Sequence, residues 1–525
     1  MIQDKSIFCG RRRFRGSAKR SAPLPPGGRR RDAGGAASSG RSTMSMDGAA
    51  RSYPRILHLV GGEYVDGPSG GRPVLNPATG AELGLIPRID EALLDEVARR
   101  AFEGFRRWRR TPAYGRAEIL KKAAGLMRER VEALAWTITV EQGKPLREAR
   151  GEVFGTAAIF EWLAEESCRI ADEILASRIP GMQQVIHHDP IGPVLAIAPW
   201  NMPAMMAGRK IAHALSCGCP VIVKPASQTP GIVMELARIL LEAGLPADAI
   251  HVVHGDPDAI ARFLIAAPQI RKVSFTGSTE VGRTLGALCG HHVKRFTAEL
   301  GGHAPVVICP DVDVDEVART LVAGKFFNAG QSCMAPTRFL AHRSVAGAFT
   351  EAFAAHAAAI RVGNGLDEQN GMGAMINMRA VSTMGEFVAE ARDRGARLAA
   401  GGGRPADEGA FFEPTVLADV PLAARVMNDE PYGPIAAITP YDEREEAVRI
   451  SNGLPYGLCA YVFGRDPSCT QAIAAELEAG LVGINTLNVG GPMVPFGGVK
   501  DSGLGREGSR HGLHEHLVTK TVTRM

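Results

Sequence analysis

Short apolar runs alternate with amphipathic helical stretches from about Ile56 onward, and this alternation limits the fold more than any other feature of the chain. Each run ends near a Gly, Pro or polar turn, and most are followed by a helical pattern: "VLAIAPWN", "VIVKPA", "IHVVHG", "KVSFTG" and "APVVIC". Repeated alternation of this kind predicts an α/β class fold, a parallel sheet with helices on both faces. In such folds ligands bind beyond the carboxyl ends of the strands.

A second alternation begins after Cys333, with the runs "RFLAHR", "EPTVLADV" and "GPIAAITPYD". We therefore expect two α/β domains with a cleft between them, and 525 residues are enough for two or three domains with their own cores. Nearer the N-terminus, "RILHLVGGEYVDG" predicts a hairpin, and Glu91–Trp108 predicts a helix from its apolar spacing of three and four. The apolar runs are too often interrupted by Pro, Lys and Gly to predict a membrane span.

The net charge of +4 is unevenly distributed along the chain. Residues 1–46 hold eleven Lys or Arg and two Asp, so the remainder carries a net charge of −5 and lacks the basic stripe that nucleic-acid binding needs. Residues 1–50 are predicted to be a disordered basic extension, since they are rich in Gly, Pro, Ser and Arg. Their composition is that of an organellar transit peptide, but an inert tail or a mis-set translation start upstream of Met44 or Met46 would look the same.

The nine cysteines show no paired spacing that implies a disulfide framework, so we expect a reducing compartment and a cytoplasmic location. Cys217 and Cys219 form a close pair with no His or second Cys pair nearby, and we expect packing there and no metal site. Cys333 follows an Asn-Ala-Gly-Gln turn in "KFFNAGQSCMAPTRF". It is either a buried small hydrophobe or a nucleophile that a substrate can reach.

Polar residues at other strand ends are further candidates for chemistry. Glu299, in "TAELGGHAP", lies between an apolar strand and a Gly pair, where partial burial would raise its pKa toward that of a general base. Asn201, in "APWNMP", could donate its amide to an oxyanion. Taken alone, the pattern around Glu299 favours a surface carboxylate and that around Asn201 favours a turn residue.

Two segments have the pattern of a nucleotide site. In "FTGSTEVG" a strand turns through Gly277 and Ser278 into a helix, whose free N-terminal amides and dipole attract phosphate. Lys224, in "VIVKPASQTP", could bind a ribose hydroxyl or a phosphate. An ordinary strand–turn–helix and a solvated lysine remain open as alternatives.

Seven ordered blocks together resemble the NAD(P)-dependent aldehyde dehydrogenase superfamily: "PWN", "KPAS", "FTGSTEVGR", "ELGGHAP", "FNAGQSC", "NDEPYGP" and "PFGGVKDSGLGREG". The resemblance covers about residues 55–525, and the spacings agree, with 34 positions from Glu299 to Cys333 and 97 from Cys333 to Glu430. It implies two doubly wound parallel-sheet domains plus an oligomerisation arm. The implied segments are 51–170 and 190–301 for dinucleotide binding, 302–492 for catalysis with the nucleophilic cysteine, and 171–189 with 505–525 for the arm.

The resemblance implies a hydrolytic aldehyde dehydrogenase. Cys333, with a lowered thiol pKa, would add to the aldehyde and form a thiohemiacetal. The Asn201 amide and the Cys333 backbone N–H would hold the oxyanion. Hydride loss would leave a thioester, and Glu299 would activate the water that hydrolyses it. Relatives that transfer the acyl group to coenzyme A lack this glutamate, so we expect a carboxylic acid as the product.

The resemblance also implies a dinucleotide cofactor, either NAD or NADP. Strongly NAD-selective relatives often carry Glu at the position of Ser227, where it repels a 2′-phosphate; serine removes that repulsion and admits NADP. The positions that match cofactor contacts in the family are Trp200, Lys224, Gly277, Ser278, Leu300 and Glu430, with Glu430 expected at the nicotinamide ribose.

Within the superfamily the chain looks most like bacterial succinate-semialdehyde dehydrogenases. That branch binds the substrate carboxylate with two arginines and a serine; Arg209 matches the first arginine, but Phe327 and Gly490 replace the others. The aldehyde is therefore either a semialdehyde such as succinate semialdehyde or an apolar or aromatic aldehyde in a pocket lined by Phe327. A non-catalytic binding protein on the same fold is the third alternative. We expect a homodimer or homotetramer, no nucleic-acid or membrane partner, and, because Ala335 replaces a second cysteine, no local redox switch.

Overall fold

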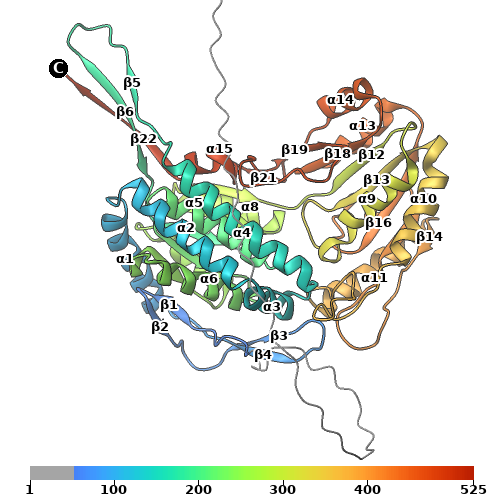
Figure 1. Cartoon of the computed structure of the whole chain (residues 1–525), viewed down its shortest axis with the longest axis horizontal. Coiled ribbons are helices and arrows are strands. Elements are labelled where there is room, and N and C mark those ends of the chain that lie inside the picture. Colours follow the sequence, from blue (N-terminus) through green and yellow to red (C-terminus); the bar gives the residue numbers. More distant parts are fainter. Residues whose placement is uncertain (1–51) are drawn as a thin grey trace, which may run out of the picture. The chain divides into compact units, whose positions relative to one another are not determined.

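The computed structural model describes residues 52–525 (Figure 1). The chain divides into two units, Met1–Ala50 and Arg51–Met525. The predicted disordered extension, residues 1–50, lies outside the described residues. No helix within residues 52–525 is long and apolar enough to cross a membrane.

The first large sheet has eight strands in the order β2-β1-β9-β8-β7-β10-β11-β21. Its five central strands are parallel, and β1 and β21 pair with its two sides in antiparallel fashion. The strand order runs from β7 through β8 to β9 in one direction and from β10 to β11 in the other, so a topological switch point lies between β7 and β10. The strands are β1 His58–Val60, β2 Glu63–Val65, β7 Val194–Ile197, β8 Val221–Lys224, β9 Ile250–Val252, β10 Lys272–Thr276, β11 Arg295–Glu299 and β21 Gly503–Leu504.

Helices cover both faces of this sheet, and its strands are therefore buried on both sides. Val194 and Ala196 of β7 belong to one buried cluster, whereas Leu195 between them belongs to the other. The first cluster includes α2 Ala113–Glu129, α3 Val131–Gln142, α4 Leu146–Ser167, α5 Pro203–Ser216 and α6 Pro230–Ala243; the second includes α1 Glu91–Trp108, α7 Pro257–Ala266 and α8 Thr279–His291. The predicted helix 91–108 is confirmed, and so is the hairpin, as β1 and β2.

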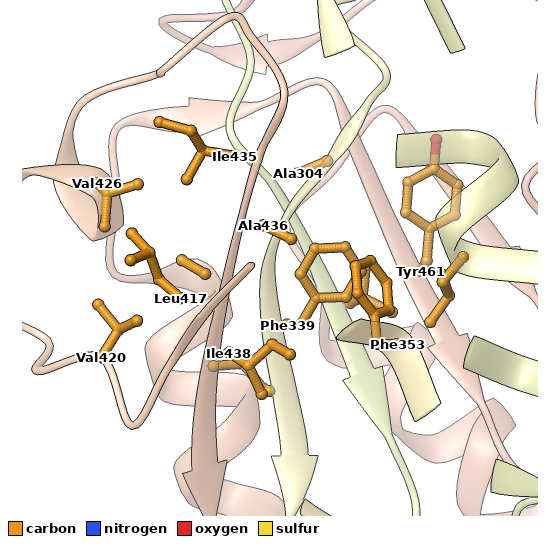
Figure 2. Close-up of a cluster of buried hydrophobic side chains, with 14 of the residues drawn as sticks. Ala304, Phe339, Phe353, Leu417, Val420, Val426, Ile435, Ala436, Ile438 and Tyr461 are labelled. Atoms are coloured by element: carbon orange, nitrogen blue, oxygen red, sulfur yellow. The ribbon is translucent and has the colours of Figure 1, made fainter. Parts of the chain in front are cut away.

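The second large sheet has seven strands in the order β14-β15-β16-β13-β12-β18-β19, all parallel to their neighbours except β14 with β15. Its core includes the rings of Phe339 and Phe353, whose centroids lie 5.0 Å apart (Figure 2). The strands are β12 Ala304–Ile308, β13 Pro336–His342, β14 Arg397–Ala400, β15 Thr415–Ala418, β16 Ile435–Tyr441, β18 Cys459–Phe463 and β19 Leu481–Ile484. The helices are α9 Val314–Phe326, α10 Arg343–Ala358, α11 Met378–Asp393, α12 Arg425–Asn428, α13 Arg444–Asn452 and α14 Pro467–Glu476.

Three small sheets complete the described fold. β22 Leu517–Arg524 and β5 Glu173–Leu175 flank β6 Gln183–Pro190. The other two are the hairpin of β3 Arg72–Leu75 with β4 Glu82–Ile86, and the pair β17 Tyr456–Gly457 with β20 Val499–Lys500. The short helices are η1 Ala247–Ala249, η2 Phe327–Gly330 and α15 Ser509–His514. The α/β class with two parallel sheets is confirmed, and the domain boundaries given above stay a prediction.

Candidate active site

Cys333 follows a tightly turned segment whose backbone is held from several sides. Asn328 and Ala329, in η2, adopt left-handed φ angles of 52° and 53°, a costly conformation for residues with a Cβ. Side-chain Nδ2 of Asn328 donates to the carbonyls of Asn201 at 3.0 Å and Gln331 at 3.1 Å, and its backbone N–H donates to the Glu148 carboxylate at 2.8 Å. These contacts fix the turn that leads to a partly exposed Cys333.

Asn201 reaches this turn from the other large sheet. It lies four residues beyond the end of β7 and is buried, and its Nδ2 donates to the Gln331 carbonyl at 3.2 Å. Because the carboxyl end of β7 borders the switch point, the residues after it lie where the fold places ligands. The structure therefore brings Asn201 to the turn before Cys333, as an oxyanion donor would need.

Glu299 is the last residue of β11 and is only 2% exposed. Neither of its carboxylate oxygens has a hydrogen-bond partner within the described part of the chain. Burial, followed by the negative charge of Glu507, raises the pKa of Glu299 well above its usual value, although Lys210 and Arg209 act in the opposite direction. The raised pKa expected from the sequence is thus confirmed.

The Cys333 thiol lies among charged groups. Burial, followed by the carboxyls of Glu430 and Glu299, raises its pKa to about 12, although Arg209 acts in the opposite direction. The expectation of a lowered thiol pKa is therefore wrong for the side chains described here, because burial and two neighbouring carboxyls outweigh one cation. The same interactions place Glu299, Glu430 and Arg209 within electrostatic range of Cys333.

The Gly pair of "ELGGHAP" allows Glu430 and Cys333 to approach the strand-end turn after β11. A Cβ on Gly301 would lie 2.8 Å from Oε2 of Glu430, and one on Gly302 would lie 2.7 Å from the Cys333 carbonyl oxygen. Gly302 instead donates its N–H to Oε1 of Glu430 at 3.2 Å. Burial raises the pKa of Glu430 to about 8, against the lowering effect of the Lys325 charge.

The expected cofactor residues lie at the carboxyl ends of the neighbouring strands. Lys224 ends β8 and is buried, and this burial lowers its pKa to about 8, so it is not a solvated surface lysine. Ser278 caps α8, and the N–H of Gly277 donates to the Glu299 carbonyl at 3.0 Å. Leu300 packs against Gly282 of α8, since a Cβ there would lie 2.3 Å from its side chain.

These residues fit a dinucleotide. A buried amine and a helix N-terminus suit its hydroxyls and phosphates, and Ser227 lines a cavity of about 540 Å³ nearby. Beyond the end of β7, the ring of Trp200 meets the ring of Tyr432 edge to face, with centroids 5.6 Å apart. The donors needed for an extended, anionic ligand are therefore present along the carboxyl edge of the first sheet.

The expected substrate residues come from α5 and η2. Arg209 is buried on α5, its guanidinium lies 4.8 Å from the Phe496 ring centroid, and its Nη1 has no hydrogen-bond partner in residues 52–525. No carboxylate of the described chain forms an ion pair with it within 4.0 Å. Phe327 is partly buried at the start of η2. Gly490 lies near Met334, whose sulfur would be 3.9 Å from an added Cβ.

Sequence reasoning missed several buried charged residues near the site. Lys210 forms an ion pair with Glu507 and also donates to the Ser274 hydroxyl at 3.2 Å. Lys325 is fully buried, its Nζ has no partner among the described residues, and burial lowers its pKa to about 7. One signal was available, since Lys210 follows Arg209 on a helix that is otherwise apolar or small on its inner side. Glu507 lies within "PFGGVKDSGLGREG" and Lys325 begins "KFFNAGQSCMAPTRF", but neither motif indicated a role for these two charges.

A model of the Aldehyde dehydrogenase family matches residues 64–522. The succinate-semialdehyde dehydrogenase (NADP(+)) of Escherichia coli strain K12 is 40% identical over 467 residues, which are 88% of this chain and 96% of that protein. The 4-(hydroxymethyl)benzenesulfonate dehydrogenase of Comamonas testosteroni is 40% identical over 466 residues, with the same shares covered. A crystal structure of succinate-semialdehyde dehydrogenase from Burkholderia pseudomallei superposes with a TM-score of 0.88 at 40% identity, covering 90% of this chain and 98% of that one.

Proposed function

Because the chain belongs to the aldehyde dehydrogenase family, we propose that it oxidises an aldehyde bearing an anionic group, such as succinate semialdehyde, to the carboxylic acid with NAD(P)+. The anionic group is inferred from Arg209, whose buried guanidinium lies near Cys333 and forms no ion pair with a described carboxylate. Glu299 and Glu507 act on this cation without forming an ion pair with it, and an anionic substrate would add the direct partner that it lacks. Membership of an enzyme family sets aside the alternative of a non-catalytic binding protein.

In the first half-reaction the Cys333 thiol releases its proton to solvent, its sulfur attacks the aldehyde carbon, and the carbonyl oxygen becomes an oxyanion. Nδ2 of Asn201 and the backbone N–H of Cys333 donate to that oxygen, whose charge appears only on attack. The present bond from Asn201 to the Gln331 carbonyl, at 3.2 Å, is long enough to be exchanged for a bond to an oxyanion. NAD(P)+, which Lys224, Ser278 and Glu430 would help to hold, would supply the hydride acceptor and a positively charged ring. Loss of hydride from the adduct leaves a thioester on Cys333.

In the second half-reaction Glu299 accepts a proton from the water that attacks the thioester. The carboxylic acid leaves, and the Cys333 sulfur regains a proton. The raised pKa of Glu299, caused by burial and by Glu507, makes it a stronger base than a solvated glutamate once it is ionised. Glu507 remains paired with Lys210, so it holds a negative charge close to Glu299.

The names of two relatives support an anionic substrate. The Escherichia coli protein is named for succinate semialdehyde, which carries a carboxylate, and the Comamonas testosteroni protein for a benzenesulfonate, which carries a sulfonate. A second candidate, an apolar or aromatic aldehyde, rests on Phe327, which places a ring where the succinate-semialdehyde branch has a second arginine.

Three further expectations are part of the proposal. Ser227 leaves room for NADP as well as NAD, because no carboxylate stands at its position. The sheet of β5, β6 and β22 would serve as the arm of a homodimer or homotetramer. The cytoplasmic location and the domain boundaries stay predictions from the sequence.

Steady-state kinetics on the purified protein test the proposal. Succinate semialdehyde, benzaldehyde and hexanal are compared, each with NAD and with NADP, and Cys333→Ala should abolish turnover. Arg209→Leu should lower kcat/KM for succinate semialdehyde by about 10- to 100-fold, the loss of a charge-assisted contact, and change hexanal oxidation only a few-fold. Arg343→Leu, which alters an exposed arginine on α10, is the matched control. If the wild type and Arg209→Leu both preferred hexanal or benzaldehyde to succinate semialdehyde, and to the same degree, the second candidate would be favoured.

A further inference from the structure

A cavity of about 540 Å³ opens beside Ser227, at the carboxyl edge of the first sheet. One wall comes from the segments after β8 and β9, which contribute Ser227, Gly255 and Asp256. The opposite wall comes from the β3–β4 hairpin and the residues after it. These residues are Gly71, Arg72, Pro73, Ile86, Pro87, Arg88 and Ile89. The hairpin lies outside every motif that pointed to a cofactor, so its part in this cavity is visible only in the fold.

The hairpin wall presents two arginines without partners. Arg72 and Arg88 are both exposed, and neither guanidinium makes a hydrogen bond or an ion pair with any residue in 52–525. Arg55, on the adjoining surface, differs because its guanidinium binds both carboxylate oxygens of Asp66, at 2.8 and 2.9 Å. Two guanidinium groups that line one cavity are thus free to bind an anion, and a planar guanidinium matches the oxygens of a phosphate.

The charge around the cavity favours an anion. Asp256 is the acidic lining residue, but its Oδ1 accepts the Ala259 N–H at 2.9 Å as the cap of α7. Both Arg72 and Asp256 act electrostatically on the buried Lys224, so that amine lies within range of the cavity. Two lining guanidinium groups, with the Lys224 amine within electrostatic range, therefore stand against one lining carboxylate, which caps α7.

We propose that Arg72 and Arg88 bind the 2′-phosphate of NADP in this cavity and make the enzyme prefer NADP to NAD. The inference rests on the proposed function, in which NAD(P)+ is the cofactor and Ser227 leaves room for NADP. A 2′-phosphate would occupy the cavity that Ser227 and the two arginines line. NAD, with a hydroxyl there, leaves both arginines without an anionic partner.

Calorimetric binding of nucleotide fragments to the purified full chain tests the inference without turnover. The probes are 2′,5′-ADP, which carries the 2′-phosphate, and 5′-AMP, which lacks it. The wild-type protein should bind 2′,5′-ADP at least about tenfold more tightly, the worth of one or two charge-assisted contacts. Arg72→Ala and Arg88→Ala should each weaken 2′,5′-ADP by about tenfold and leave 5′-AMP within twofold.

Controls separate this inference from its premise. Arg55→Ala removes a nearby arginine that is already paired with Asp66, and should change neither affinity. Arg72→Lys keeps the charge but loses the planar fork, and should fall between wild type and Arg72→Ala. Equal affinity of wild type for the two probes, or an unchanged 2′,5′-ADP affinity in both alanine variants, would overturn the inference while aldehyde oxidation with NAD continued. Failure of both probes to bind would overturn the dinucleotide premise as well.

Discussion

Glu299 shows how a single residue acquires its chemistry from neighbours that are distant in sequence. Its oxygens have no hydrogen-bond partner among the described residues, so its proton affinity depends on burial and on surrounding charges. Glu507, which lies beyond the second large sheet in sequence, supplies the negative charge that raises the pKa of Glu299. Lys210 keeps Glu507 ionised by pairing with it. The pKa of Glu299 is thus shifted by the Lys210–Glu507 ion pair, although Glu299 makes no hydrogen bond to either residue.

Glu507→Gln should shift the acid limb of the kcat profile to lower pH. The substitution removes the negative charge that raises the pKa of Glu299 and leaves the Lys210 cation that lowers it, so the pKa of Glu299 falls. Since Glu299 works as a base when deprotonated, activity would rise at a lower pH than in wild type. The measurement is kcat between pH 5 and 9 for conditions in which thioester hydrolysis limits turnover. Glu478→Gln, at an exposed pair with Lys500, is the control, and an unmoved or upward-shifted limb would contradict the prediction.

At the scale of elements, a buried ion pair joins α4 to the start of α5. Nζ of Lys144 lies 2.6 Å from Oε2 of Glu152, and both side chains are at most 2% exposed. The other oxygen of Glu152 accepts the N–H groups of Ala204 at 2.8 Å and Met205 at 3.1 Å, which caps α5. Lys144 also donates to the Asn201 carbonyl at 2.8 Å. One pair therefore fixes both a helix terminus and the proposed oxyanion donor.

Lys144→Met should lower the free energy of unfolding by about 3–5 kcal/mol, because it leaves the Glu152 charge buried without a partner. We also expect a lower kcat with little change in KM, since the Asn201 segment loses a tether but the substrate contacts remain. Urea unfolding and steady-state kinetics measure the two effects. Lys121→Met breaks the exposed pair with Glu165 and should cost less than about 1 kcal/mol. A comparable loss in both variants would argue against a special role for the buried pair.

Elements with a strong local signal were predictable from the sequence, and contacts made only by tertiary packing were not. Helix 91–108 was predictable because its apolar residues keep helical spacing, and the structure adds that Asp90 caps it. Asn201, Glu299 and Cys333 were proposed because each follows a strand-like run or a turn motif and matches a family position, and their roles stay predictions. The two-residue strand β21 has no periodicity to detect. The Lys144–Glu152 pair and the direction of the Cys333 pKa depend on which charges folding brings together, and a single sequence does not carry that.

At the scale of the whole molecule, the small sheet of β5, β6 and β22 leaves apolar side chains in solvent. Ile174 is 72% exposed on β5, and Leu175 and Val522 are also exposed. Both flanking strands of this sheet are edges, which carry unpaired backbone groups. Exposed apolar residues on a sheet with open edges favour contact with another copy of the chain.

Ile174→Lys should reduce the proposed dimer or tetramer to smaller species in sedimentation velocity runs. The reason is that the lysine replaces an apolar contact with a charge that would have to be desolvated. Tyr114→Lys is the matched control, because Tyr114 is also 72% exposed but lies on α2. A wild-type chain that sediments as a monomer, or a variant that keeps the wild-type assembly, would rule out this surface as the contact.

The pairing of β21 with β11 has a consequence for protein synthesis. β11 ends at Glu299, whereas its neighbour β21 begins at Gly503, after the entire second large sheet. A ribosome adds about 5–20 residues per second, so the roughly 200 residues between them take on the order of 10–40 s. During that interval the edge of β11, and with it Glu299, waits uncovered on the nascent chain. The surroundings of the general base are thus completed among the last parts of the protein. A nascent chain that stalls between Cys333 and Gly503 carries the nucleophile and the general base but not the strand that covers β11.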